Sequence, residues 1–214
     1  MEFINTIISF IQDGGTFMYP ILVVFAIGAA IAMERSINLS IVRKKNIKVW
    51  DEINPVMAEH DFDKAREMTT GDNSAIATLI SMGLAREGTV RRRDDIEIGM
   101  EEAMLEITPQ LEKRTAYVAL LANISTLLGL LGTIMGLIEA FTAVANANPA
   151  EKADMLSASI SVAMNTTAFG LIAAIPLLIF HAFLISKTSD ITNSLEMVSV
   201  KTLNYITDSA RRQG

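Results

Sequence analysis

The sequence predicts an all-α membrane protein with three transmembrane helices and a helical cytoplasmic domain. The first observation is that half of the 214 residues are hydrophobic, which gives a mean hydropathy of +0.36. The second is that the apolar residues form three runs of about twenty or more, which is the length needed to cross a bilayer. Each run must be helical, because lipid offers no hydrogen-bond partner to a free backbone amide.

The three predicted spans cover residues 17–39, 115–145 and 156–187. The first span contains one charged pair, Glu34 and Arg35, near its far end. The other two spans are apolar over most of their length. We therefore expect a short connection at 146–155 between spans two and three, and a large connection at 40–114 between spans one and two.

Residues 1–16 precede the first span and predict a short amphipathic helix on the membrane surface. Its apolar stripe consists of Phe3, Ile4, Ile7, Ile8 and Ile11. A frayed extension of the first span is the alternative interpretation. This segment contains no Lys or Arg, so we expect no cleavable signal peptide.

Basic residues predict the orientation of the spans. They gather in the large connection and in the tail: Arg43, Lys44, Lys45, Lys48, Arg91, Arg92, Arg93, Lys113, Arg114, Lys187, Arg211 and Arg212. The short connection at 146–155 contains only Lys152. By the positive-inside rule, the 40–114 connection and the tail at 188–214 are cytoplasmic, and the amino terminus lies on the other side.

The cytoplasmic connection is expected to be helical. A charged helix is expected over Asp61–Glu67, and Ser74 is placed to cap a second helix. A third helix should begin near Asp94 and run toward span two, with Pro109 kinking or restarting it. We interpret Arg91–Arg93 as a patch that faces solvent or lipid headgroups.

Several classes of function are disfavoured by composition. The chain has no cysteine, and its two histidines, His60 and His181, are far apart, so we expect no metal site and no cofactor. A net charge of −6 gives no footprint for nucleic acid. No phosphate-binding loop or catalytic motif is present, so we expect a protein that is not an enzyme.

Small and hydroxyl residues line one face of spans two and three. In span two they are Ser125, Gly129, Gly132, Thr133, Gly136, Ala140 and Ala143. In span three they are Ser159, Ala163, Thr166 or Thr167, Gly170 and Ala174, followed by Pro176, which permits a kink. Apart from the adjacent Gly132 and Thr133, the steps are three or four residues, which places each set on one side of a helix. Such a face serves close helix contact or a polar path.

Ionisable side chains are absent from the central parts of the three spans. Glu34, Arg35, Glu139 and His181 lie toward the ends. A proton relay normally needs a titratable group near mid-depth, and this chain offers hydroxyls there instead: Thr133, Thr166 and Thr167. If an ion passes, either neutral oxygens coordinate it or another chain supplies the carboxylate. The alternative is that each threonine bonds its own helix and has no further role.

Two segments carry a resemblance to a known family. They are LLGLLGTIMGLIEAF at 127–141 and ISVAMNTTAFGLIAAIP at 160–176. Together they resemble the paired signature of the ExbB/TolQ/MotA ion-channel family. With three spans the chain is closer to ExbB or TolQ than to MotA, which has four.

The resemblance implies a homopentameric helical bundle in the bacterial inner membrane, with spans two and three around a central pore. It implies an ExbD- or TolR-like dimer whose single spans enter the pore, each with a membrane aspartate. Proton flow past that aspartate would move the partner, which would pass force to a TonB- or TolA-like protein. It also implies a periplasmic amino terminus and contact with membrane lipid.

Residue roles follow from the resemblance at matching positions only. Thr133 and Thr167 match the pore threonines of spans two and three. Many relatives have a glutamate where this chain has Val162, and the Thr166–Thr167 pair is similar to that of sodium-driven relatives. Sodium coordinated by Thr133, Thr166 and Thr167 is therefore the alternative to protons. The expected pore and packing residues are Gly129, Gly132, Gly136, Ala163, Gly170, Ala174 and Pro176. A passive membrane scaffold or a small-solute transporter remains the alternative of a different class.

Overall fold

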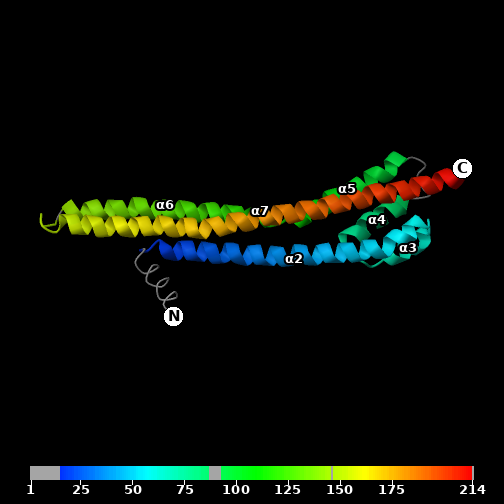
Figure 1. Ribbon diagram of the computed structural model, residues 1–214. Helices are drawn as coiled ribbons and strands as arrows, with labels where there is room; N and C mark the ends of the chain where they lie inside the picture. Colours follow the sequence, from blue (N-terminus) through cyan, green and yellow to red (C-terminus); the bar gives the residue numbers. More distant parts are fainter. Residues whose placement is uncertain (1–14, 87–92, 146, 214) are drawn as a thin grey trace, which may run out of the picture. The chain divides into compact units, whose positions relative to one another are not determined.

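A computed structural model describes residues 15–86, 93–145 and 147–213, and the regular structure within them is entirely helical (Figure 1). The helices are α2 (Met18–Ala58), α3 (Phe62–Thr69), α4 (Ala75–Arg86), α5 (Arg93–Glu112), α6 (Thr115–Ala145) and α7 (Lys152–Gln213). Three helical stretches are long and apolar enough to cross a membrane. The all-helical fold with three spans is thus confirmed. Residues 1–14 of the helix expected at 1–16, and the basic pair at 91–92, lie outside the described residues.

The chain forms two compact units, and α2 and α7 each contribute to both. The first, called the apolar unit, comprises residues 1–34 and 114–183. The second, called the loop unit, comprises 35–113 and 184–214. Each unit therefore contains segments that are far apart in the sequence.

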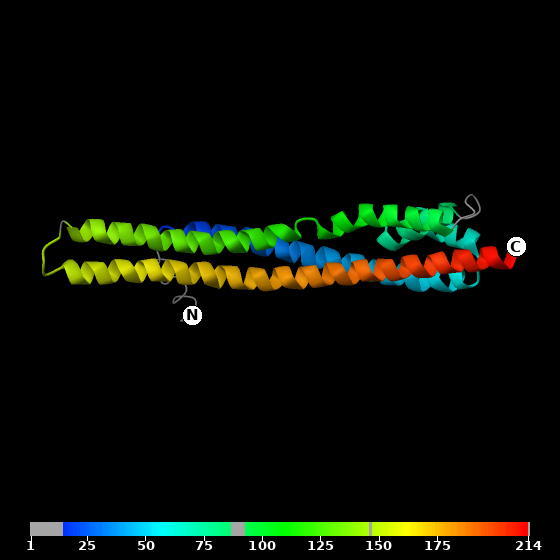
Figure 2. The same cartoon turned by 90° about the horizontal axis from the view of Figure 1, so that it is seen from above.

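In the apolar unit, α6 and the first part of α7 run antiparallel and side by side (Figures 1 and 2). The first part of α2 packs against this pair through Gly28. A Cβ atom added at Gly28 would lie 2.8 Å from Leu177 of α7 and 3.5 Å from Leu121 of α6. The absence of a side chain at this position lets α2 approach both helices closely.

In the loop unit, α3 and α4 begin at side-chain caps. The Asp61 carboxylate accepts a hydrogen bond from the Lys64 amide at 3.2 Å, and the Ser74 hydroxyl accepts one from the Ala77 amide at 3.2 Å. Both caps satisfy amides that have no partner within their helix. The helix starts expected at Asp61 and Ser74 are therefore confirmed. The buried side chains behind them include Ile53, Met57, Ile76, Leu79, Ile80 and Leu84.

The loop-unit parts of α2 and α7 run parallel at a constant register of 151 residues. The Lys187 ammonium donates to the Ser36 carbonyl oxygen at 3.2 Å. The Tyr205 hydroxyl hydrogen-bonds the Asn54 side-chain oxygen at 3.1 Å, again 151 residues away. These two contacts fix which residues of α2 and α7 lie at the same level.

The break between α5 and α6 falls later than the sequence predicted. Pro109 lies inside α5, which continues to Glu112, and the helix does not restart at the proline. Pro109 lacks only the one amide that would bond the preceding turn. The chain instead turns at Arg114, whose φ of 65° ends the helical path. The buried Arg35 guanidinium of α2 donates to the Leu111 carbonyl oxygen just before this turn.

Two helices extend well beyond the predicted spans. The sequence placed the end of span one at residue 39 and the end of span three at residue 187. In the structure, α2 continues to Ala58 and α7 to Gln213. Hydropathy marks where a helix leaves an apolar environment, and charged residues beyond that point are still good helix formers.

Candidate ion-pathway site

α6 and α7 approach each other closely around Thr167 and Gly129. The Thr167 hydroxyl donates a hydrogen bond to the Gly129 carbonyl oxygen at 2.9 Å, across the two helices. A Cβ atom added at Gly129 would lie 3.2 Å from the Gly170 Cα, and one at Gly170 would lie 2.8 Å from the Ser125 carbonyl oxygen. The two backbones therefore touch, and the threonine hydroxyl joins them.

Thr166 lies inside the apolar unit. Its side chain is 2 % exposed, and its hydroxyl donates to the Val162 carbonyl oxygen at 3.0 Å, one turn earlier in α7. Its methyl group fills the space that a side chain at Gly132 would need. The Phe17 Cβ borders the same space, 3.2 Å from where a Gly132 Cβ would lie. Burial of this kind favours a packing role for Thr166.

Thr133 lies on a more open side of α6. Its hydroxyl donates to the Leu130 carbonyl oxygen of the same helix at 2.6 Å, and the side chain is half-buried. One turn further along, Gly136 faces Ala163, which would lie 3.0 Å from an added Cβ atom. Thr133 and Thr167 thus keep access to the space outside this chain, whereas Thr166 does not. The pore role of all three stays a prediction.

The remaining predicted positions continue the α7 stripe. Ala163 and Ala174 are 2 % and 3 % exposed, so each lies against neighbouring helices of the unit. Pro176 is half-buried inside α7, which continues on both sides of it. The stripe expected from the sequence is therefore a contact surface within one chain over most of its length.

The site offers oxygen atoms and no permanent charge. Residues 18–33, 115–138 and 155–180 contain no Asp, Glu, Lys, Arg or His. Within the described residues, no group of three or more Asp, Glu, His or Cys side chains is arranged to hold a metal ion. Hydroxyl and carbonyl oxygens can replace part of the water shell of a cation, but they cannot carry a proton through a titration step.

Two features of the site were not anticipated from the sequence. The first is that the Thr167 hydroxyl bonds the other helix and not its own. The second is that Phe17, at the start of the first predicted span, packs beside Gly132. A glycine opposite a threonine in an antiparallel pair is the signal for the first, because the missing side chain lets the threonine hydroxyl reach a backbone carbonyl oxygen.

A family model matches residues 71–197, which include α4, α5, α6 and most of α7. Its description is the MotA/TolQ/ExbB proton channel family. The chain belongs to this family. The resemblance of the two membrane segments is thereby confirmed, and both segments lie inside the match.

Individual ExbB and TolQ proteins are similar to this chain. A putative ExbB homolog of Methanothermobacter thermautotrophicus is 24 % identical over 94 % of this chain and 71 % of its own length. The biopolymer transport protein exbB1 of Vibrio cholerae is 43 % identical over 41 % of this chain and 36 % of its own. The Tol-Pal system protein TolQ of Haemophilus influenzae is 39 % identical over 36 % of this chain and 33 % of its own.

Membership in the MotA/TolQ/ExbB family fixes the class of the protein. Together with three apolar helices, it makes the chain a multi-pass membrane protein. The family is one of proton-channel subunits, so the chain is a subunit of that general type. The match to exbB1 covers under half of each protein.

Proposed function

We propose that this chain is the pore-forming subunit of an ion-driven motor complex in the bacterial inner membrane. Five copies form a ring in which α6 and α7 surround a central pore. An ExbD- or TolR-like dimer places its single spans in that pore. Ion flow then becomes mechanical work on a TonB- or TolA-type protein, for outer-membrane transport or envelope integrity.

The observation that carries this proposal is the character of the α6–α7 pair. Thr167 and Gly129 join the two helices through a 2.9 Å hydrogen bond at a depth where the chain has no ionisable side chain. A channel of the proton type needs a titratable group at that depth. The missing group must come from a second polypeptide, and a membrane aspartate of the partner supplies it.

Protons are the proposed ion, because the family is one of proton channels. Sodium is the alternative, and the chain itself supplies the observation that favours it. Val162 stands where the family resemblance implies a glutamate, and two adjacent threonines follow one turn later, at 166 and 167. Neutral oxygens such as those of Thr133 and Thr167 suit a desolvated sodium ion.

The proposed topology has a periplasmic amino terminus and a cytoplasmic carboxyl terminus. The loop unit then lies in the cytoplasm, because its part of α2 contains the cluster Arg43, Lys44, Lys45 and Lys48. A cysteine introduced at the exposed Lys64 of the loop unit should react with a membrane-impermeant thiol reagent only after the inner membrane is opened. Labelling in intact spheroplasts would show that the orientation is opposite to the one proposed.

Co-purification tests the assembly directly. The tagged chain is expressed alone and together with a single-span protein that has an aspartate near the start of its span. We expect an oligomer of this chain in mild detergent that retains the second protein. A monomer that never binds such a partner would overturn the proposal.

Substitution of Thr167 tests the pathway. Thr167→Val keeps the shape but removes the hydroxyl, so we expect loss of ion-driven activity with assembly intact. Thr142→Val is the matched control, because the Thr142 hydroxyl donates to Ile138 of its own helix at 2.8 Å and the residue is exposed. If Thr167→Val is as active as Thr142→Val, Thr167 has no role in the pathway.

The passive scaffold is the competing function of a different class. The close α6–α7 packing is equally suited to it, because small residues serve helix contact in any membrane bundle. In a scaffold, Thr167→Val would lower the stability of the helix bundle but would cause no separate loss of function. The same pair of variants therefore distinguishes the two functions.

A further inference from the structure

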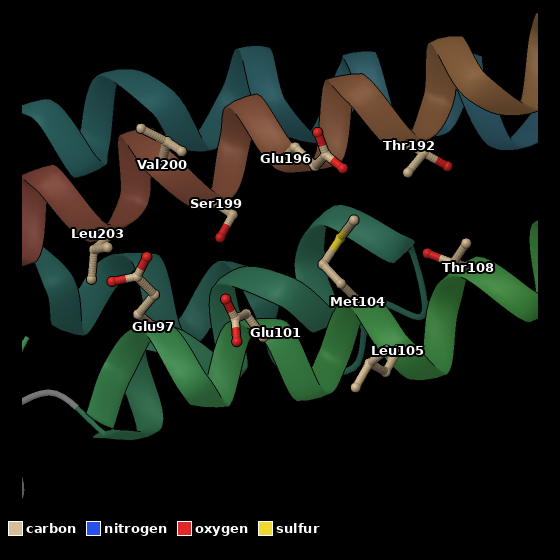
Figure 3. A pocket seen from close by; sticks show the side chains of 10 residues that line it. All are labelled: Glu97, Glu101, Met104, Leu105, Thr108, Thr192, Glu196, Ser199, Val200 and Leu203. Atoms are coloured by element: carbon tan, nitrogen blue, oxygen red, sulfur yellow. The ribbon is translucent and has the colours of Figure 1, made fainter. Parts of the chain in front are cut away.

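A groove in the loop unit runs between α5 and the last part of α7 (Figure 3). It encloses a space of about 640 Å³. Apolar side chains form much of it, among them Met104, Leu105 and Val200. Three carboxylates, Glu97, Glu101 and Glu196, stand along the same groove. We call it the acidic groove, and no residue of α2 lines it.

The side chains that line the acidic groove are partly exposed and, among the described residues, lack partners of opposite charge. Leu105 is 75 % exposed and Val200 is 56 % exposed. Within the residues that the structure describes, no ion pair engages Glu97, Glu101 or Glu196. Apolar side chains flanked by unpaired carboxylates favour a partner helix that is apolar along one part of a face and basic along the next.

The loop-unit part of α2 presents such a face. Ile37, Ile41, Lys44 and Lys48 follow one another at steps of four, three and four residues, so they lie on one side of the helix. Ile37 is 62 % exposed and Ile41 is 60 % exposed. Lys44 has no ion pair within the described residues, and Lys48 has only a long one, at 3.9 Å, to Glu52 of its own helix. We call these four residues the basic stripe.

The register of the loop unit places the two surfaces at the same level along the helices. Arg35 of α2 contacts the carbonyl of Leu111, so α2 and α5, which run antiparallel, share a level there. Lys44 is nine residues after Arg35 in α2, which corresponds to about 13.5 Å along the helix. Glu101 is ten residues before Leu111 in α5, which corresponds to about 15 Å in the same direction. The same count places Lys48 level with Glu97, and Ile41 level with Leu105.

The contact between α2 and α7 gives the level of the third carboxylate. The register of 151 residues, fixed by Lys187 and Ser36, places Glu196 level with position 45 of α2. The carboxylates of both groove helices therefore lie at the level of Lys44 and Lys48. The apolar side chain Leu105 lies at the level of Ile41.

Rotation of a copy about an axis parallel to the helices preserves these levels. A head-to-tail ring uses two different surfaces of each copy, and it closes when each surface fits the other. We propose that the acidic groove receives the basic stripe of a neighbouring copy of this chain. The contact rests on the proposed assembly of several copies and specifies which cytoplasmic surfaces hold it.

Disulfide cross-linking tests the contact, because the chain has no cysteine of its own. Two differently tagged copies are expressed together with the single-span partner, one with Lys44→Cys and the other with Glu101→Cys. Oxidation should give a dimer that has both tags, and little dimer with the same tag twice. Arg43→Cys replaces Lys44→Cys in the control, because it points about 100° away on the helix.

The cross-linking outcomes separate the two proposals. If Arg43→Cys links as well as Lys44→Cys, or if the assembled ring links neither, the groove contact is wrong while the ring stands. If Glu101→Cys links to the single-span partner, the groove belongs to that partner, and the contact proposed here is wrong. A chain that is monomeric throughout would overturn the contact and the proposed function together.

Charge reversal provides a second test that does not depend on disulfide geometry. Lys44→Glu with Lys48→Glu, and separately Glu97→Lys with Glu101→Lys, should each weaken assembly by roughly three- to ten-fold at low salt, the size expected for two exposed pairs. The variant with all four changes should recover. A fourfold variant that assembles no better than either double variant would overturn the contact.

Discussion

Gly132 has no room for a side chain, because the methyl group of Thr166 fills the space beside it. Gly132→Ala should therefore push α6 and α7 apart and cost about 1–3 kcal/mol of stability, as overpacking does in other tightly packed interiors. Thermal unfolding of the assembled complex in detergent measures the loss. Thr166→Ser removes the methyl group, so it should recover part of the loss in the double variant.

The recovery expected in the double variant depends on contact between residues 132 and 166. Residues that touch do not have additive effects on stability, whereas distant residues do. Losses that simply add for Gly132→Ala and Thr166→Ser would mean that the two residues do not meet. The α6–α7 contact would then differ from the one described above.

Asp72 makes the stability of the loop unit depend on acidity. The hydrogen bond from the Lys45 ammonium lowers the pKa of the Asp72 carboxyl from its ordinary value of 3.8, against a smaller opposing effect of burial. The ion pair between the two side chains measures 2.9 Å, and the Ser74 amide also donates to this carboxylate. The folded protein thus holds this carboxyl ionised at a lower pH than the unfolded chain does.

A folded pKa below the unfolded value gives stability that is present above 3.8 and is lost as the pH falls through the folded value. Asp72→Asn should therefore destabilise the protein near neutral pH, and the difference from the parent should shrink below about pH 4. Chemical unfolding at a series of pH values measures it, with the exposed Asp63→Asn as control. A difference that is constant with pH would contradict the effect.

The junction of α5 and α6 depends on a side chain from a third helix. Arg35 is 4 % exposed and donates to the Leu111 carbonyl oxygen beside the turn at Arg114. Arg35→Met keeps the bulk but leaves that carbonyl without its charged donor, so we expect a loss of about 1.5–3 kcal/mol. Arg35→Lys keeps the charge and should lose less.

Hydrogen exchange locates the consequence of the Arg35 variants within the chain. Amides of the last turn of α5 and the first turn of α6 should exchange faster in Arg35→Met, because the turn at Arg114 is then less firmly held. Amides in the middle of α6 should be unchanged. Uniformly faster exchange along α6 would mean that Arg35 stabilises the whole bundle and has no particular effect at this junction.

Helices and their starts were largely predictable from local sequence. Ser74 was placed as a cap by its residue type and position, and its bond to the Ala77 amide is a local interaction. The end of α5 was not predictable from local sequence, and the Leu111 carbonyl there accepts a hydrogen bond from Arg35, 76 residues away. Pro109 gave a strong local signal at the wrong position.

The candidate site was likewise predictable in part. Glycines and threonines at steps of three and four predicted a shared face, and Gly129 and Gly170 do meet. Which hydroxyl crosses between the helices was not predictable, because Thr166 and Thr167 are adjacent and differ only in the direction of the side chain. The structure places Thr166 against Gly132 and directs the Thr167 hydroxyl to Gly129.

At the scale of the whole molecule, the proposed function assigns half of an ion pathway to one chain. Its membrane helices offer hydroxyl and carbonyl oxygens and no titratable side chain in their central parts. Its loop unit offers two surfaces of opposite charge at matching levels. In the proposed assembly, other copies and a single-span partner complete both features.

Ion flux into sealed proteoliposomes is the measurement that tests this account most directly. The chain alone, the chain with its single-span partner, and the chain with a partner whose membrane aspartate is changed to asparagine are compared under an imposed membrane potential. We expect flux only with the unchanged partner, and a loss of that flux in Thr167→Val. Equal flux through the chain alone would contradict the claim that the titrating group comes from a second polypeptide.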